Sequence, residues 1–378
     1  MSLKEIARVT GLSVPTVGNV LGRSAARYSA ETRQRVLEAA REIGYKPNSS
    51  ARAMRQGRSG CAALVLSRTR QSSHSHIPAG LLDGLDDELS LHNMHLTISR
   101  LTDEELTRDD VLPKVLREYL ADGMIVNYTH EIPPAMLELI QAHHTPAVWL
   151  NAKLAEDCVY PDDYGAARSA TAQLIAMGHR RIAFVQFVTP SLSGYSFEQA
   201  LPRLHYSAAD RREGYLTAMR DAGLAPHIAY HDRFVPEPEH WAACEAILSP
   251  ADRPTALLLY SDRDVSVVMS AAAALGLSVP RDLSVAAFVP TEPWVAGKFL
   301  SVVPIPTAEM GRRVVRMLLQ KIKAPDAPCA AQAVPYEPNF RDTVAPPPSS
   351  VVASSSPSKR RRVAAGGVNF KSHTSNGQ

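Results

Sequence analysis

The residues with the clearest chemical signature lie in the first 60 positions, where basic side chains outnumber acidic ones. This stretch holds eleven lysines and arginines against four acidic residues, a net charge of +7. Residues 61–344 carry 25 basic and 34 acidic residues, a net charge of −9. Because lysine and arginine release counter-ions from nucleic-acid phosphates, this segregation indicates an N-terminus that binds DNA. A solvated charged face without a partner is the alternative.

Two short helices joined by a glycine can position these charges. The first is predicted over residues 3–10 and ends before Gly11. The second begins after Ser13, whose hydroxyl can cap it, and Pro15 fits the first turn because its missing N–H would have no intrahelical partner. The apolar positions of the pair are Ile6, Ala7, Val9, Val17, Val20 and Leu21, whereas Val14, Pro15, Gly18 and Asn19 lie opposite. This outline is typical of a helix-turn-helix.

A third helix is predicted over residues 30–43. Ser29 can cap its start, and Gly44 follows where a left-handed residue commonly ends a helix. Three short helices with so few apolar side chains give only a marginal core. The predicted buried stripe comprises Val36, Leu37, Ala40 and Ile43.

Several ordered segments of the first 48 residues follow one known pattern. They are Leu3-Lys4-Glu5-Ile6-Ala7, Gly11, Ser13, Thr16-Val17, Val20-Leu21, Glu31-Thr32-Arg33 and Gly44-Tyr45-Lys46-Pro47-Asn48. These segments closely resemble the DNA-binding headpiece of the lactose-repressor family, and the resemblance continues to about residue 344. It implies a second helix in the major groove of operator DNA, with Val14, Pro15 and Asn19 at base edges and Thr16 near a phosphate.

Two residues of the second helix depart from the family pattern. Gly18 replaces the usual serine, and Asn19 stands where arginine, histidine or lysine is frequent. Asparagine pairs with adenine through N6 and N7, whereas arginine prefers guanine. We therefore expect a shifted operator preference.

Residues 48–56 are a candidate hinge helix that is too short to be stable alone. The resemblance places Met54 where an apolar side chain enters the minor groove and unstacks a base step, with Arg52 and Arg55 near phosphates. An unstructured linker is the alternative.

After residue 60 the sequence alternates apolar runs with helical patterns, as in an α/β domain. The length suits two lobes better than one core. The resemblance specifies a periplasmic-binding-protein-like body of two doubly wound lobes behind an all-α helix-turn-helix headpiece, with chain crossings near residues 160, 290 and 320. The predicted strands are 62–66, 96–98, 123–126 and 147–150, then 181–185, 256–259 and 283–288, with helices over 166–177 and 211–222.

The resemblance also proposes an effector-binding cleft at the carboxyl ends of these strands. Amides, a carboxylate, a guanidinium and one aromatic ring would bind a small polar ligand, which in this family is commonly a sugar or a purine. The predicted lining is Asn127, Asn151, Ser207, Arg211, Phe234, Ser261 and Asp262. Asp162, Asp163 and Asp262 have an alternative role as helix caps.

Two cleft positions are less polar than the family pattern. The run 287–290 reads Ala-Phe-Val-Pro where the family usually has Gly-Phe-Asp-Asp, and Ile305 occupies a position that is often polar. Losing a carboxylate–hydroxyl hydrogen bond costs about 1.5–3 kcal/mol, so an ordinary hexose is doubtful. Three possibilities stay open: a less polar or differently oriented sugar, a sugar acid or phosphate bound mostly by Arg211, or no small ligand.

Catalysis and metal binding have little support in the sequence. No nucleophile elbow, phosphate-cradling loop or Cys-x-x-Cys pair occurs. His227 and His231 have i, i+4 spacing, but Pro226 flanks them and no cysteine lies nearby, so a metal site is not expected there. No cofactor is expected. The four scattered cysteines are expected to be reduced and buried, in a cytoplasmic protein without a signal peptide or membrane-spanning segment.

The last segment is Pro/Ser-rich and then basic, and is predicted to be disordered. Its basic tetrad at 359–362 could contact DNA or serve as a nuclear address, with a solvated tail as the alternative. No leucine heptads follow the body, so a homodimer that reads a palindromic operator is the minimal assembly.

The sequence thus predicts a headpiece (1–46), a hinge and linker (47–60), a two-lobed effector-binding and dimerisation body (61–344) and a disordered basic tail (345–378). The expected function is that of a transcriptional regulator, most simply a repressor, whose affinity for double-stranded operator DNA depends on a small ligand. The alternatives are a cytosolic sugar-binding receptor, an effector-independent DNA-binding regulator and a cytosolic enzyme.

Overall fold

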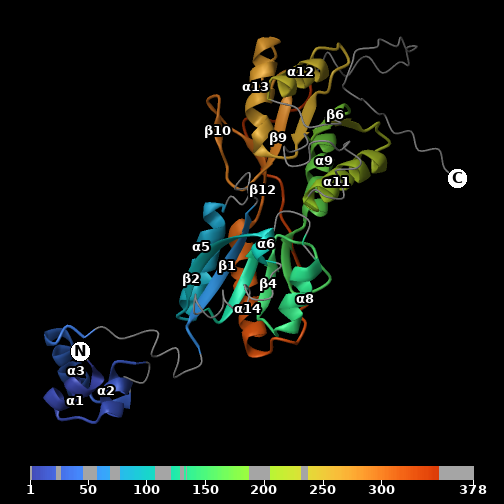
Figure 1. Cartoon of the computed structure of the whole chain (residues 1–378). Helices are drawn as coiled ribbons and strands as arrows, with labels where there is room; N and C mark the ends of the chain where they lie inside the picture. The colour runs from blue at the N-terminus through green and yellow to red at the C-terminus, as the bar shows by residue number, and fades with distance from the viewer. Residues whose placement is uncertain are drawn as a thin grey trace. The chain divides into compact units, whose positions relative to one another are not determined.

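A computed structural model of the chain contains two compact units, Met1–Ser59 and Gly60–Gln378 (Figure 1). Each unit is described by itself. The structure describes residues 2–22, 27–45, 58–68, 77–106, 121–127, 132, 134–186, 205–230 and 237–348.

The first unit contains three helices, α1 (Leu3–Thr10), α2 (Val14–Val20) and α3 (Ala30–Glu42). The predicted caps are confirmed, because Ser13 Oγ accepts the Thr16 N–H at 3.1 Å and Ser29 Oγ accepts the Thr32 N–H at 3.2 Å. Gly11 ends α1 in the left-handed conformation, with φ 66°, which glycine adopts without a steric penalty. Local capping therefore defines the starts of α2 and α3 and the end of α1.

The headpiece core lies where the three helices meet, and one predicted member is missing from it. Leu37 is 45% exposed, so its predicted place in the buried stripe of the third helix was wrong, and the apolar Val9 is 53% exposed. Val36 and Ala39–Ala40 form the i, i+3, i+4 stripe of α3, and Leu37 lies about 100° around the helix from Val36. The buried apolar residues are Ile6, Ala7, Val17, Val20, Val36, Ala39 and Ala40, with Ile43 and Leu21 partly buried beside them.

The second unit has a first lobe built on a parallel sheet with strand order β13-β5-β4-β3-β1-β2. Its strands are β1 (Cys61–Arg68), β2 (His95–Thr102), β3 (Gly123–Asn127), β4 (Ala147–Leu150), β5 (Cys158–Pro161) and β13 (Gln332–Val334). Helices α5 (Ala79–Leu91) and α14 (Thr307–Lys323) cover one face and α8 (Pro134–Ala142) the other, while α6 (Asp103–Leu106) directly follows β2. Helices α5 and α14 pack side by side (Figure 1), so closely that a Cβ at Gly84 would overlap the Ala308 carbonyl oxygen.

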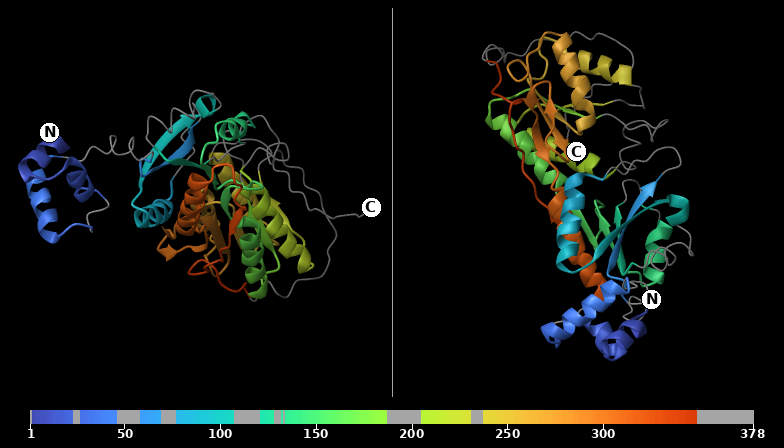
Figure 2. Two further views of the ribbon diagram at one scale, coloured as in Figure 1. Left: turned by 90° about the horizontal axis from the view of Figure 1, so that it is seen from below. Right: turned by 90° about the vertical axis from the view of Figure 1, so that its left-hand side faces the viewer.

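The second lobe has its own parallel sheet, in the order β12-β9-β8-β6-β7. Its strands are β6 (Ile182–Val185), β7 (His227–Ala229), β8 (Ala256–Leu259), β9 (Ser284–Val289) and β12 (Ser301–Pro304). Helices α9 (Asp163–Ala176) and α11 (Ser207–Asp221) pack on one face, and α12 (Glu237–Leu248) and α13 (Val265–Ala274) on the other (Figure 2). The predicted architecture of two doubly wound lobes behind a helical headpiece is confirmed.

The chain crosses between the lobes at one predicted place and at two others. The first crossing follows β5, as expected near residue 160. The crossings predicted near 290 and 320 were wrong: a hairpin, β10 (Trp294–Val295) and β11 (Lys298–Phe299), and then β12 keep the chain in the second lobe until about residue 305. The third crossing follows β13, since Asn339 then pairs with Val302 in the second lobe.

The start of the predicted tail is bound to the second lobe. The Ala345 carbonyl accepts hydrogen bonds from His179 Nε2 and Ser284 Oγ, both at 2.9 Å. The prediction of disorder was therefore wrong for residues 345–348, and the remainder of the tail lies outside the described residues. Cys158 and Cys244 are buried as expected, whereas Cys61 and Cys329 are only partly buried, and all four cysteines are free.

One buried carboxyl group of the second lobe predicts a pH dependence. Asp264 ends a short 3-10 helix, η4 (Asp262–Asp264), and is 6% exposed. Burial raises its pKa from the ordinary 3.8 to about 7, with Arg263 opposing the rise and Asp262 adding to it. As the pH rises, Asp264 loses its proton near pH 4 in the unfolded chain but only near pH 7 in the folded protein. The free energy of unfolding therefore falls between about pH 4 and about pH 7.

The Asp264→Asn variant should therefore be more stable than the wild type at about pH 8 and equal to it near pH 4. Each pKa unit corresponds to about 1.4 kcal/mol, so the gain at alkaline pH is at most about 4 kcal/mol. Urea unfolding of both proteins across this pH range measures the difference. Parallel pH profiles would show that Asp264 is charged in the folded protein.

Candidate functional site

The second helix of the headpiece presents one face to solvent. Val14 is 37% exposed, and Pro15 and Asn19 are also exposed, while Val17 and Val20 are buried. The Thr16 hydroxyl lies 2.8 Å from Ser13 Oγ, so it takes part in the helix cap and is partly buried. The side chains predicted to meet base edges therefore share an exposed face, and the expected phosphate contact lies at the helix start. The hinge residues Arg52, Met54 and Arg55 lie outside the described residues.

Asn19 is held by a residue that sequence reasoning missed. Its Nδ2 donates a hydrogen bond to the Tyr28 hydroxyl at 3.1 Å. Tyr28 comes just before α3, and no periodic pattern links it to Asn19. The contact fixes the Asn19 amide without occupying its acceptor oxygen.

The Asn19→Ala variant should lose about 1–3 kcal/mol of specific operator affinity and keep its affinity for random DNA. An asparagine amide reads a base edge, whereas phosphate contacts are independent of sequence. Competition binding with specific and random duplexes measures both quantities. The control is Tyr28→Phe, which removes the hydrogen bond but keeps Asn19. Equal losses on the two duplexes would refute a base contact.

In the body, two predicted effector residues lie at the carboxyl ends of first-lobe strands. Asn127 is the last residue of β3 and is 5% exposed, and its Oδ1 has no hydrogen-bond partner among the described residues. Asn151 directly follows β4 in the left-handed conformation, with φ 58°, which asparagine tolerates better than most residues. Both therefore reach the edge of the sheet where a doubly wound fold binds ligands.

Arg211, the predicted guanidinium, is bound within the second lobe. Its Nε donates to Asp163 Oδ1 at 2.6 Å and its Nη1 to the Tyr260 carbonyl at 2.7 Å. The Tyr336 hydroxyl donates to the same Asp163 oxygen at 2.5 Å. The guanidinium also lies 4.3 Å from the centre of the Phe288 ring. Arg211 is thus fixed by an ion pair, a carbonyl and an aromatic face.

The Asp163–Arg211 pair is nearly dry, since its side chains are 0% and 7% exposed. Burial, the largest single effect, lowers the pKa of Arg211, but the Asp163 carboxylate together with the neighbouring Tyr336 and Tyr260 raises that pKa above its ordinary value. The pKa of Tyr336 is also raised, first by burial and then by Asp163. The cluster of Asp163, Arg211 and Tyr336 therefore holds one negative and one positive charge, which compensate each other.

A second group of contacts joins the two lobes beside this pair. His205 Nε2 donates to the Asn151 carbonyl at 2.6 Å, and the Tyr206 hydroxyl donates to Asn151 Oδ1 at 3.4 Å. Lys153 forms an ion pair with Asp210 at 2.7 Å. The start of α11 is therefore bound to the segment after β4.

The other predicted effector residues differ in their surroundings. Ser207 is buried and its Oγ lies 2.9 Å from the Tyr260 hydroxyl. Ser261 is partly buried and Asp262 is exposed, and neither forms a side-chain cap. Asp162 is a cap, because its Oδ1 accepts the Gly165 N–H at 3.0 Å, whereas Asp163 is an ion-pair partner. Phe234 lies outside the described residues.

The network therefore joins three predicted residues, Asn151, Ser207 and Arg211, through partners that sequence reasoning largely missed. Tyr260 comes just after a predicted strand, so its place at the sheet edge could have been foreseen. Tyr336 could not, because 173 residues separate it from Asp163. The described residues contain no group of three or more His, Cys, Asp or Glu side chains suited to a metal ion. No described helix is long and apolar enough to cross a membrane.

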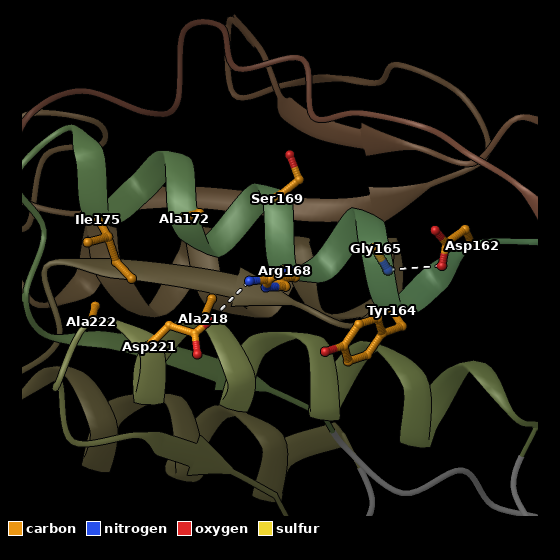
Figure 3. A pocket seen from close by; sticks show the side chains of 10 residues that line it. All are labelled: Asp162, Tyr164, Gly165, Arg168, Ser169, Ala172, Ile175, Ala218, Asp221 and Ala222. Atoms are coloured by element: carbon orange, nitrogen blue, oxygen red, sulfur yellow. Dashed lines mark hydrogen bonds and ion pairs between the residues drawn. The ribbon is translucent and has the colours of Figure 1, made fainter.

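An open groove lies elsewhere on the second lobe, between α9 and α11 (Figure 3). Its volume is about 640 Å³, and small side chains such as Ala172 and Ala218 are among the residues that line it. The ion pair of Arg168 with Asp221, at 3.0 Å, crosses it. It includes none of the predicted effector residues, so we do not assign the ligand to it.

Each of the two units matches the model of a known protein family. Residues 2–48 match the family model of bacterial regulatory proteins of the lacI family, and residues 171–344 match a periplasmic binding protein-like domain. The ribose operon repressor of Haemophilus influenzae is 26% identical over 332 residues, covering 86% of this chain and 93% of that protein. The transcriptional regulator RafR of Escherichia coli is 26% identical over 277 residues, covering 70% and 74%.

Solved structures agree on the fold. The lac repressor dimer bound to operator and the anti-inducer ONPF superimposes with a TM-score of 0.68 at 20% identity, covering 91% of this chain and 99% of that one. The complex of the regulator CelR with cellobiose gives 0.58 at 23% identity, with the same coverage. The fold agrees with the two family-model matches, and by those matches the chain belongs to the LacI/GalR family of DNA-binding transcriptional regulators.

Proposed function

We propose that this regulator is a homodimeric repressor that binds a palindromic operator and is controlled by a small polar ligand. The observation that carries the proposal is the exposed face of α2, where Val14, Pro15 and Asn19 stand opposite the buried Val17 and Val20. A helix of this kind at the surface of a basic headpiece fits the major groove. Arg52, Met54 and Arg55 would add phosphate and minor-groove contacts.

The ligand is proposed to bind at the carboxyl ends of the two sheets. The residues would be Asn127, Asn151, Ser207, Arg211, Phe234, Ser261 and Asp262. The buried polar atoms at this edge support the proposal, as do relatives that are named as a ribose operon repressor and a regulator in complex with cellobiose. We therefore favour a sugar or a sugar derivative.

Ligand binding would alter operator affinity by changing the arrangement of the two lobes. The contacts of Asn151 and Lys153 with the start of α11 join the lobes next to the proposed ligand site. A ligand that binds one arrangement of the lobes more tightly would shift the population toward that arrangement. The protein would act in the cytoplasm, with its DNA, and without a catalytic step.

The experiment is a genome-wide footprint of the purified full-length protein, repeated with a pool of sugars and sugar acids. We expect protection of a few palindromic sites, with an affinity that changes when the pool is added. If the protein bound no site more tightly than bulk DNA at low salt, the proposed sequence-specific repressor function would be refuted. Sites that are bound equally with and without the pool would favour the effector-independent alternative.

A further inference from the structure

The carboxyl edge of the second-lobe sheet holds a polar side chain that the sequence did not single out. Gln186 directly follows β6, and its backbone N–H donates to the Ala229 carbonyl at 2.9 Å. Val185 pairs with Ala229 on one side and Leu259 on the other. Continuing this register, Gln186 lies between Tyr230 and Tyr260 at the edge of the sheet.

Alternation along β6 decides which face Gln186 occupies. Ile182 and Phe184 belong to the core on the side of α9 and α11, whereas Ala183 and Val185 belong to the opposite core. Because side chains alternate along a strand, Gln186 falls on the same face as Phe184. This is also the face on which Arg211 contacts the rings of Tyr260 and Phe288. The Gln186 side chain therefore lies on the face of the sheet that carries Tyr260 and Phe288, the two rings that Arg211 contacts.

The side-chain amide of Gln186 is buried and has no partner among the described residues. The residue is 1% exposed, and neither Nε2 nor Oε1 forms a hydrogen bond with any described residue. Buried polar side-chain atoms are nearly always paired, so an amide with both ends unpaired calls for a further partner. The free ends offer two N–H donors and a carbonyl acceptor, which is the complement of a hydroxyl group.

The neighbouring charges restrict what that partner can be. The guanidinium of Arg211 is balanced by the Asp163 carboxylate, whose second oxygen, Oδ2, is buried without a partner among the described residues. An anionic ligand would have to share this dry space with the carboxylate, and like charges repel strongly there. A neutral ligand that donates a hydroxyl hydrogen would satisfy Oδ2.

We propose that Gln186 is a specificity-determining residue of the effector site and that the site takes a neutral, hydroxyl-rich ligand, not a sugar acid or sugar phosphate. The inference rests on the proposed function only in assuming that a ligand enters at this edge of the sheets. Gln186 supplies donor and acceptor groups on the face of the sheet where Arg211 and Asp163 lie. Asp163 excludes anions, and Arg211 keeps that carboxylate in place.

The first test uses the ligand-free protein and the Gln186→Met variant, which has nearly the same shape but no amide. We expect its midpoint of thermal unfolding to equal or exceed that of the wild type, because no hydrogen bond is lost. The matched control is Gln173→Met, at an exposed position of α9 in the same lobe. If the midpoint of Gln186→Met lay clearly below those of the wild type and of Gln173→Met, the amide would stabilise the folded protein, and the proposal would be overturned.

The second test measures binding by calorimetry with paired probes: glucose against glucuronate and glucose 6-phosphate, ribose against ribose 5-phosphate, and cellobiose alone. We expect at least one neutral probe to bind the wild type, with an affinity at least tenfold higher than that of its anionic counterpart. The Gln186→Met variant should bind that neutral probe about tenfold more weakly. Equal binding by the variant, tighter binding of an anion, or no binding of any neutral probe overturns the proposal. Operator binding of the same samples without probes reports on the repressor function separately.

Discussion

Replacing Arg211 with methionine should lower the free energy of unfolding of the body by about 3–5 kcal/mol, because a buried carboxylate would lose its counter-ion. Asp163 is fully buried, and only the Tyr336 hydroxyl would remain as a side-chain donor to it among the described residues. The ring contacts of the guanidinium with Phe288 and Tyr260 would be lost as well. Urea denaturation, followed by far-UV circular dichroism, measures the change.

Two further variants separate charge from packing. Arg168→Met removes an ion pair whose side chains are 54% and 55% exposed, and should cost less than about 1 kcal/mol. The double variant Asp163→Asn with Arg211→Met removes both buried charges, and should be more stable than Arg211→Met alone. A loss of under 1 kcal/mol in Arg211→Met, or no recovery in the double variant, would contradict a dry ion pair.

This pair also shows why the sequence predicted the body better than its site. The strands at 62–66, 123–126 and 256–259 are continuous apolar runs, so their burial in parallel sheets follows from composition alone. Arg211 binds Asp163, which in turn accepts from Tyr336, and only the crossings between the lobes bring these distant segments together. Sequence reasoning placed two of those crossings too early and could not foresee the cluster.

Local chemistry explains the opposite outcome in the headpiece. The helix starts were predicted because Ser13 and Ser29 cap through bonds to residues three positions on, and such bonds are visible in sequence. The exposure of Leu37 was missed because it depends on the angles at which helices pack, which apolar spacing does not fix. Gln186 was missed for a related reason: one polar residue after an apolar run looks like an ordinary strand end.

The packing of the headpiece leads to the prediction with the largest effect on function. Ile6 is fully buried at the centre of a core in which the described part of the headpiece has seven buried apolar residues. The Ile6→Ala variant should lose about 2–5 kcal/mol, which approaches the whole stability that so small a core can supply. Because only folded headpieces bind the operator, and a dimer needs two, affinity should fall roughly tenfold or more.

Footprint titration measures this loss, and hydrogen exchange of the headpiece amides measures the unfolding that causes it. The matched control is Val9→Ala on the same helix, where the side chain is 53% exposed and the change should stay within about 0.5 kcal/mol. Thermal unfolding of the body should be the same in both variants, because the two units have separate cores. Weakened operator binding with unchanged headpiece exchange would mean that Ile6 affects DNA binding by a route other than folding.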